Sequence, residues 1–172
     1  MAIGQNRVIA TEDPAMAPPL RFSALPAAEV ARVRAGGPDA NGQPAETRIS
    51  DGAGNPCRHC LREVPEGAPM LVLAWRPFPA AQPYAETGPI FLCADCARRP
   101  DGPEIPPVIA DRREIMVRGY GADDRIVYGS GVVVAIADLA PCCEALLAQD
   151  RVAYLHLRSA SNGCYQARVD RA

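Results

Sequence analysis

Residues 55–69 read NPCRHCLREVPEGAP, and residues 88–100 read GPIFLCADCARRP. Each stretch contains one C-x-x-C pair, 32 residues separate the two pairs, and together they comprise Cys57, Cys60, Cys93 and Cys96. Two such pairs are the usual way to supply the four soft ligands that a structural zinc ion takes in a tetrahedron. The pattern predicts a structural Zn²⁺ site in which the protein fills every ligand position.

The segment between the two pairs has enough sequence for a β-hairpin. The apolar runs at 69–78 and 88–93 are bounded by proline and glycine, so both are expected to be strands. Cys93 ends the second run, and the following ADCARR would begin a short helix with Cys96 in its first turn. We expect a treble-clef-like or ribbon-like arrangement of knuckle, hairpin and second pair.

Two other interpretations of these cysteines stay open. A thioredoxin-like redox pair opens a long helix, and Pro65, five residues after Cys60, leaves no room for one. Reduced, buried thiols without a metal are the other alternative. Leu61 follows the first pair where such knuckles often have glycine, and His59 is expected to face solvent or to cap a sulfur.

Composition narrows the class of protein. A chain of 172 residues suits one domain with a real core, and all 18 basic residues are arginine, a bias that a GC-rich bacterial genome explains. A net charge of −2 and a pI near 5.7 argue against a nucleic-acid surface. The apolar runs are far shorter than the ~20 residues of a membrane span. We therefore expect a cytoplasmic protein with reduced thiols and neither nucleic-acid nor membrane partners.

The remaining segments predict a β-rich α+β domain, with mainly antiparallel strands and one main helix. Residues 1–18 lack periodicity and are expected to be a flexible extension, with Met16 as an alternative start. Residues 19–172 would then form a single domain, in which 55–99 is the zinc-binding segment.

Two helices and several strands follow from local patterns. A first helix should have Pro26 in its first turn and stop at Gly36. Residues 107–137 predict three short strands with turns at 120–124 and 129–131. The clearest helix starts at Asp138, which can cap it, and its apolar face is Leu139, Cys142, Cys143, Leu146 and Leu147.

The C-terminal segments 152–158 and 164–170 predict a hairpin around SASNG. Because side chains alternate along strands, one face would carry Tyr154, His156, Arg158, Cys164, Gln166 and Arg168. The other face, which would pack into the core, would carry Leu155, Leu157, Tyr165 and Val169. A nearby histidine or arginine lowers the pKa of a thiol, as a nucleophilic cysteine requires. The face is thus a candidate ligand or catalytic site, or simply a half-exposed polar sheet face.

Four separated stretches occur in the order found in one family: FSALPAAEV, PCRHCLREVPEGAPMLVLAWRPF, PYAETGPIF and RVAYLHLRSASNGCYQARVDR. Over residues 20–172 the chain resembles the bacterial family catalogued as domain of unknown function 1203. The family has no established activity, so the resemblance implies none. Its pattern includes PCR (56–58), PY…GPIF (83–91) and GCY (163–165), and leaves Cys57, His156 and Cys164 as matching positions without an assigned role.

These observations favour a non-catalytic, zinc-stabilised module that binds a small ligand or a protein partner through the face around His156 and Arg158. The alternative is an enzyme with Cys164 as nucleophile, His156 as base and Arg158 orienting an anionic group. A third hypothesis is a redox or metal sensor in which the cysteine cluster is itself the functional site.

Overall fold

The computed structural model describes residues 19–172, so the extension expected at 1–18 lies outside the described residues. The strands are β1 (Leu20–Ser23), β2 (Glu46–Ile49), β3 (Pro69–Trp75), β4 (Gly88–Cys93), β5 (Glu114–Tyr120), β6 (Val132–Ala135), β7 (Tyr154–Ser159) and β8 (Tyr165–Arg171). The helices are α1 (Ala27–Arg34), α2 (Pro107–Ala110), the 3-10 turn η1 (Ile136–Asp138) and α3 (Leu139–Leu147). All paired strands are antiparallel, which confirms the predicted α+β class with one main helix.

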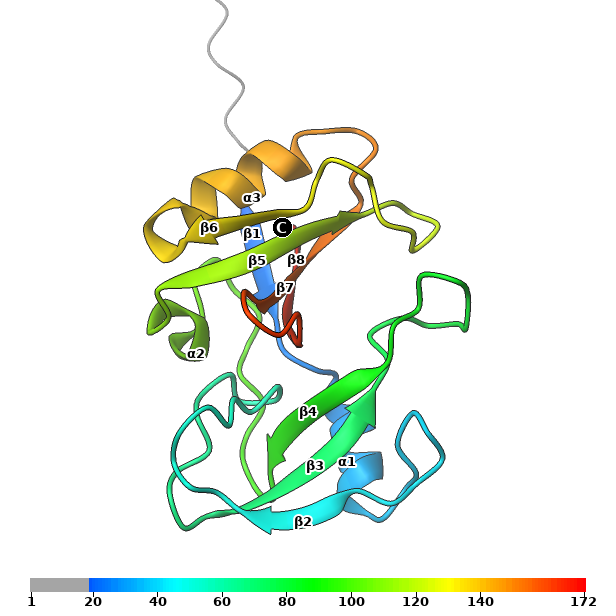
Figure 1. Cartoon of the computed structure of the whole chain (residues 1–172), viewed down its shortest axis with the longest axis vertical. Coiled ribbons are helices and arrows are strands. Elements are labelled where there is room, and N and C mark those ends of the chain that lie inside the picture. Colours follow the sequence, from blue (N-terminus) through cyan, green and yellow to red (C-terminus); the bar gives the residue numbers. More distant parts are fainter. Residues whose placement is uncertain (1–18) are drawn as a thin grey trace, which may run out of the picture.

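The larger of two sheets has the order β1-β8-β7-β5-β6, and with α2 and α3 it forms what we call the large lobe (Figure 1). One face of this sheet packs against α3. The core between them consists mainly of Ile115, Val117, Leu155, Leu157, Val169 and the helix residues Leu139, Cys143 and Leu147. The predicted apolar face of α3 is therefore confirmed, with Cys142 and Leu146 partly buried at its edge. The opposite sheet face is free to carry polar groups.

The smaller sheet, β2-β3-β4, forms the small lobe together with α1 and the cysteine loops (Figure 1). Val30 and Val33 of α1 are buried against Leu73 and Ile90 of the sheet. In the chain, the small lobe lies between β1 and β5, whereas β1 pairs with β8 in the large sheet. The chain therefore passes from the large lobe to the small lobe and back.

Several local predictions need correction. Residues 20–23, which carried no strand prediction, form β1, and Pro26 occupies the N-cap of α1 rather than its first turn. Of the three strands expected in 107–137, only two form. Residues 125–128 make a single bridge to the end of β5 instead of a strand, and residues 107–110 are helical. Asp138 precedes α3 but makes no capping hydrogen bond, because η1 leads directly into the helix.

The C-terminal hairpin is confirmed, and a bulge alters its alternation. The register is regular over 155–157, but Arg158 then lies opposite Tyr165 rather than Gln166. Because β8 contains this extra residue, the alternation of its side chains reverses. The Tyr165 ring lies 5.0 Å from the His156 ring, so the prediction that Tyr165 points into the core with the leucines is wrong. It packs with the small-lobe core instead.

Candidate functional site

Four cysteines meet in the small lobe, where the loop after residue 55 approaches the end of β4. The ligand atoms of Cys57, Cys60, Cys93 and Cys96 all lie within 4.8 Å of one another. The Sγ atoms of Cys57 and Cys96 are 3.8 Å apart, and those of Cys60 and Cys93 are 3.9 Å apart. A tetrahedron with metal–sulfur bonds of about 2.3 Å has edges of about 3.8 Å. The arrangement is therefore compatible with one bound metal ion.

Donor groups surround these sulfur atoms. The backbone N–H groups of His59 and Cys93 donate to Cys57 Sγ at 3.4 and 3.2 Å. The Arg34 guanidinium donates to Cys96 Sγ at 3.2 Å, and His59 Nδ1 lies 3.4 Å from the same sulfur. His59 thus caps a sulfur, one of the two placements expected for it. Donors of this kind favour thiolate over thiol.

The protein alone stabilises only one of the four thiolates. A hydrogen bond with Cys60 lowers the pKa of Cys57 to about 4, and the same interaction raises the pKa of Cys60. Burial, followed by the charge of Cys57, raises the pKa of Cys93 to about 12 and also raises that of Cys96. Because a metal ligand must be a thiolate, a cation bound among the four sulfur atoms would supply the stabilisation that the other three thiolates lack. The donor set suits a soft divalent metal.

Leu61 closes the first knuckle in the left-handed conformation that glycine often supplies. Its φ is 53°, and its N–H donates to the carbonyl of Cys57 at 3.0 Å. This conformation costs a non-glycine residue about 1–2 kcal/mol. The Leu61 side chain is fully buried in the large-lobe core, and burying a leucine contributes about 1.5–3 kcal/mol. The knuckle therefore forms without glycine and is anchored to the large lobe.

The helix expected at the second cysteine pair does not form. Arg99 donates its N–H to the carbonyl of His59 at 2.9 Å, and the Arg98 guanidinium donates to carbonyls of the β1–α1 linker. Pro100 also disfavours a helical conformation at the residue before it. The chain from Cys96 to Pro100 has no regular secondary structure. The predicted short helix is therefore wrong, while the four cysteines still converge as the prediction required.

Arg58 connects the first knuckle to the large lobe. Its side chain is buried, and its Nε donates to the carbonyl of Tyr165 at 2.8 Å. A second guanidinium N–H donates to the carbonyl of Pro56, while the backbone N–H of Arg58 donates to Phe91 at 3.0 Å. The PCR and GCY motifs of the family resemblance meet at this contact. The loop that carries the first cysteine pair thereby contacts the large lobe at the boundary between the lobes.

A cavity of about 750 Å³ lies between the lobes beside this contact. Its walls include Leu25, Val33, Leu73 and Trp75 from the small lobe and His156, Tyr165 and Arg168 from the large lobe. Cavities of roughly 300–1,000 Å³ with mainly apolar walls are typical of small-molecule sites. We call this the interlobe cavity.

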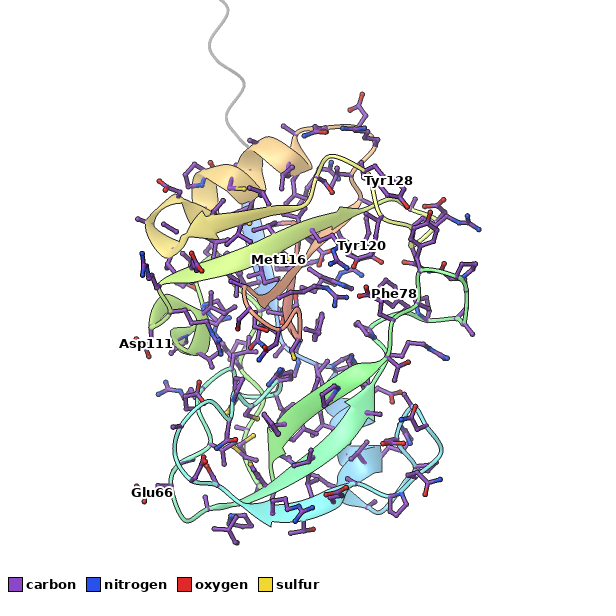
Figure 2. The ribbon with its side chains drawn as sticks, in the orientation of Figure 1. Glu66, Phe78, Asp111, Met116, Tyr120 and Tyr128 are labelled. Atoms are coloured by element: carbon purple, nitrogen blue, oxygen red, sulfur yellow. The ribbon has the colours of Figure 1, made fainter. Side chains whose placement is uncertain are left out.

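His156 lies at the wall of the interlobe cavity inside a cluster of aromatic rings. Ring centroids between 4.6 and 5.3 Å away belong to Phe78, Tyr120, Tyr154 and Tyr165. Figure 2 shows Phe78, from the β3–β4 loop, beside Tyr120 at the lobe boundary. The His156 side chain is 1% exposed, and its Nδ1 has no hydrogen-bond partner among the described residues.

Electrostatics keep His156 neutral. Burial, assisted by the charges of Arg158, Arg168 and Arg118, holds the pKa of His156 well below its usual range. Arg118, His156 and Arg168 form one row across β5, β7 and β8. Arg168 stacks 3.7 Å above the Tyr154 ring and pairs with Asp170 at 2.7 Å. The sheet face opposite α3 thus presents a neutral imidazole between two guanidinium groups.

A smaller cavity of about 360 Å³ adjoins the first and shares with it Trp75, Pro77 and Tyr165. Glu86, from the β3–β4 loop, joins two arginines at its wall. The Glu86 carboxylate lies 3.0 Å from Arg118 and 2.6 Å from Arg158. These ion pairs hold the loop against the large lobe.

The three candidate catalytic residues are divided between the two cavities. His156 lines the interlobe cavity, whereas Cys164 and Arg158 line the smaller one. Cys164 precedes β8 and is partly exposed, with its Sγ 3.9 Å from the carbonyl of Asn162. Their roles as nucleophile, base and orienting group stay predictions.

Sequence reasoning missed Trp75, Arg76 and Phe78 as site residues. They lie at the end of β3 and in the loop after it, a region assigned only to a hairpin. Trp75 is the sole tryptophan and precedes Arg76 in a proline-rich turn. A tryptophan followed by an arginine in a proline-rich turn is the local signal that could have identified this segment as part of a site.

The fold and the site define a small α+β protein in which a four-cysteine cluster, compatible with metal binding, lies in the small lobe near an interlobe cavity. The family model described as "Protein of unknown function (DUF1203)" matches residues 54–171, and the chain belongs to this family. The matched range includes all four cysteines and the His156 hairpin. Comparisons with curated proteins and with solved structures give no match. Among residues 19–172, no helix has the length and apolarity needed to cross a membrane.

Proposed function

We propose that the protein is a non-catalytic, zinc-stabilised module that binds a small ligand in the interlobe cavity. The observation that carries the proposal is the buried, unpartnered Nδ1 of His156 at the wall of a cavity of about 750 Å³. A buried polar group without a partner costs about 1–3 kcal/mol. Buried polar groups without a hydrogen-bond partner are rare in folded proteins, and functional sites are one place where they occur.

Zinc is the metal that supports this proposal best. Four thiolates at tetrahedral spacing match structural zinc, which fills all its positions with protein ligands. The ion would hold the first knuckle, and with it the contact from Arg58 to Tyr165 at the cavity wall. None of the seven cysteines forms a disulfide, as we expect of a cytoplasmic protein.

The zinc proposal is tested by mass spectrometry of native and acid-denatured protein. We expect a difference equal to one zinc ion, corrected for the protons it displaces. Cys96→Ser should abolish this difference, whereas the control Cys142→Ser, on α3, should retain it. A wild-type protein without metal would contradict the proposal.

The ligand proposal is tested through Trp75, whose single indole N–H is a unique NMR signal beside the cavity. We expect some members of a set of small aromatic compounds of differing charge to shift this signal. Ala40→Phe should abolish the shifts because Ala40 lines the cavity. The control Ala80→Phe, exposed in the β3–β4 loop, should retain them. Failure of every compound to shift the signal would refute ligand binding.

The second candidate function is a Cys/His-dependent enzyme with Cys164 as nucleophile, His156 as base and Arg158 orienting an anionic group. One observation favours it: Cys164 lines the smaller cavity together with Arg158 and Arg118. The thiol and the two guanidinium groups thus share one cavity, as the nucleophile and the anion-orienting group of such an enzyme would.

A further inference from the structure

Three side chains at the wall of the interlobe cavity contain a buried nitrogen atom with no hydrogen-bond partner among the described residues. These atoms are Trp75 Nε1, Arg76 Nε and His156 Nδ1. The indole and guanidinium nitrogens can only donate hydrogen bonds. About 90% or more of buried polar groups in folded proteins have a partner. Two such donors at one cavity, Trp75 Nε1 and Arg76 Nε, indicate that an acceptor from outside the chain belongs there.

The charges around the cavity identify the kind of acceptor. Two of its carboxylates are paired, Glu29 with an arginine at 3.2 Å and Asp170 with another at 2.7 Å. Asp39 accepts backbone N–H groups at 2.8, 3.0 and 2.9 Å. Arg76, by contrast, has no ion-pair partner in residues 19–172. Arg76 is therefore a cation at the cavity wall without a carboxylate partner, whereas the Asp39 carboxylate oxygens are held by backbone donors.

The shape of the cavity wall indicates what the apolar part of the ligand is. The flat side chains of Trp75, Phe78 and Tyr165 line the cavity together with Pro26, Pro77 and Pro79. Aromatic and proline surfaces of this kind pack well against a planar apolar group. The free guanidinium of Arg76 adjoins Trp75 in the chain.

We propose that the interlobe cavity binds a small aromatic carboxylic acid, whose ring packs among these flat side chains and whose carboxylate accepts from Arg76 and Trp75. The inference rests on the proposed function, since it names the class of ligand for the same cavity. A carboxylate suits Arg76 because guanidinium groups bind carboxylates in well-defined geometry.

The test compares three probes with one ring system: naphthalene-2-carboxylate, its neutral carboxamide, and the cationic naphthalen-2-ylmethylamine. Each is titrated into the metal-loaded full chain while the Trp75 indole N–H is followed by NMR. We expect the carboxylate to bind about tenfold or more tightly than the carboxamide, as for a hydrogen bond to a charged group. The amine should bind most weakly.

Two variants locate the carboxylate. Arg76→Gln should remove the preference for the carboxylate while leaving carboxamide binding unchanged. The matched control is Arg48→Gln, on the outer strand β2, where Arg48 is exposed and pairs with Glu46. It should behave like the wild type.

The outcomes separate this inference from the proposed function. Equal binding of all three probes would overturn the anionic class but leave ligand binding intact. A carboxylate preference that survives Arg76→Gln would overturn the assignment of Arg76. If water alone satisfies these donors, no probe will shift the Trp75 signal, and both proposals are then wrong.

Discussion

Substitutions at Leu61 can test the cost of its left-handed backbone conformation beside the four-cysteine cluster. In most buried positions alanine is more stable than glycine, whereas at a φ of 53° the order should reverse. Leu61→Ala loses about 2–5 kcal/mol of packing and keeps the left-handed conformation, which costs about 1–2 kcal/mol. Leu61→Gly relieves that cost but adds about 0.4–1 kcal/mol of unfolded-state entropy. The glycine variant should therefore be more stable than the alanine variant by about 1 kcal/mol.

The assay is urea unfolding of the metal-loaded proteins. With a slope of about 1–3 kcal/mol/M, the glycine variant should unfold at a urea concentration about 0.3–1 M higher than the alanine variant. Leu155 is the matched control, since it is equally buried but lies inside β7. There glycine should be the worse substitution by about 0.5–1 kcal/mol. The same order of variants at both positions would refute the reasoning about Leu61.

Three further predictions follow from the fold and the cavity. The pKa of His156 is depressed in the folded protein. At a pH below the unfolded-state pKa of about 6.5, the unfolded chain therefore binds a proton at this residue that the folded chain does not. The free energy of unfolding should then decrease as the pH is lowered, by up to about 1.4 kcal/mol per pH unit. His156→Gln should reduce this slope in unfolding measured between pH 6.5 and 5, and an unchanged slope would contradict the buried, neutral imidazole. The enzyme alternative requires Cys164 to react with iodoacetamide at neutral pH faster than Cys142, so equal or slower labelling would exclude it as the nucleophile. Because β1 pairs with β8 around the inserted small lobe, residues 19–172 should unfold as one unit. Trp75 fluorescence and far-UV circular dichroism should then give the same midpoint, and separate midpoints would indicate independent lobes.

Sequence reasoning succeeded where local patterns and chemistry agree. The two C-x-x-C pairs specify soft ligands at short spacing, so their convergence could be predicted without knowing the fold. The β3–β4 hairpin, α3 and the β7–β8 hairpin follow from apolar periodicity bounded by glycine and proline. The helix and the two hairpins are each formed by one continuous stretch of chain.

The failures have long-range causes. The helix expected at Cys96 does not form, and the backbone N–H of Arg99 donates instead to the carbonyl of His59 in the knuckle. The bulge that places Tyr165 opposite Arg158 has no glycine or proline within β8 to mark it in the sequence. The interlobe cavity combines β3, the β3–β4 loop and β8, which are distant in sequence. No local sequence pattern indicates that these distant segments come together around one cavity.

The two faces of β7 have a consequence for how this family can diversify. Leu155 and Leu157 lie in the core against α3, while His156 and Arg158 face the cavities. If the interlobe cavity binds a ligand as proposed, substitutions along this short strand should alternate between lowering protein abundance and changing the binding preference. Selection for a new ligand would then act on every second residue, while the residues between them maintain the stability of the core.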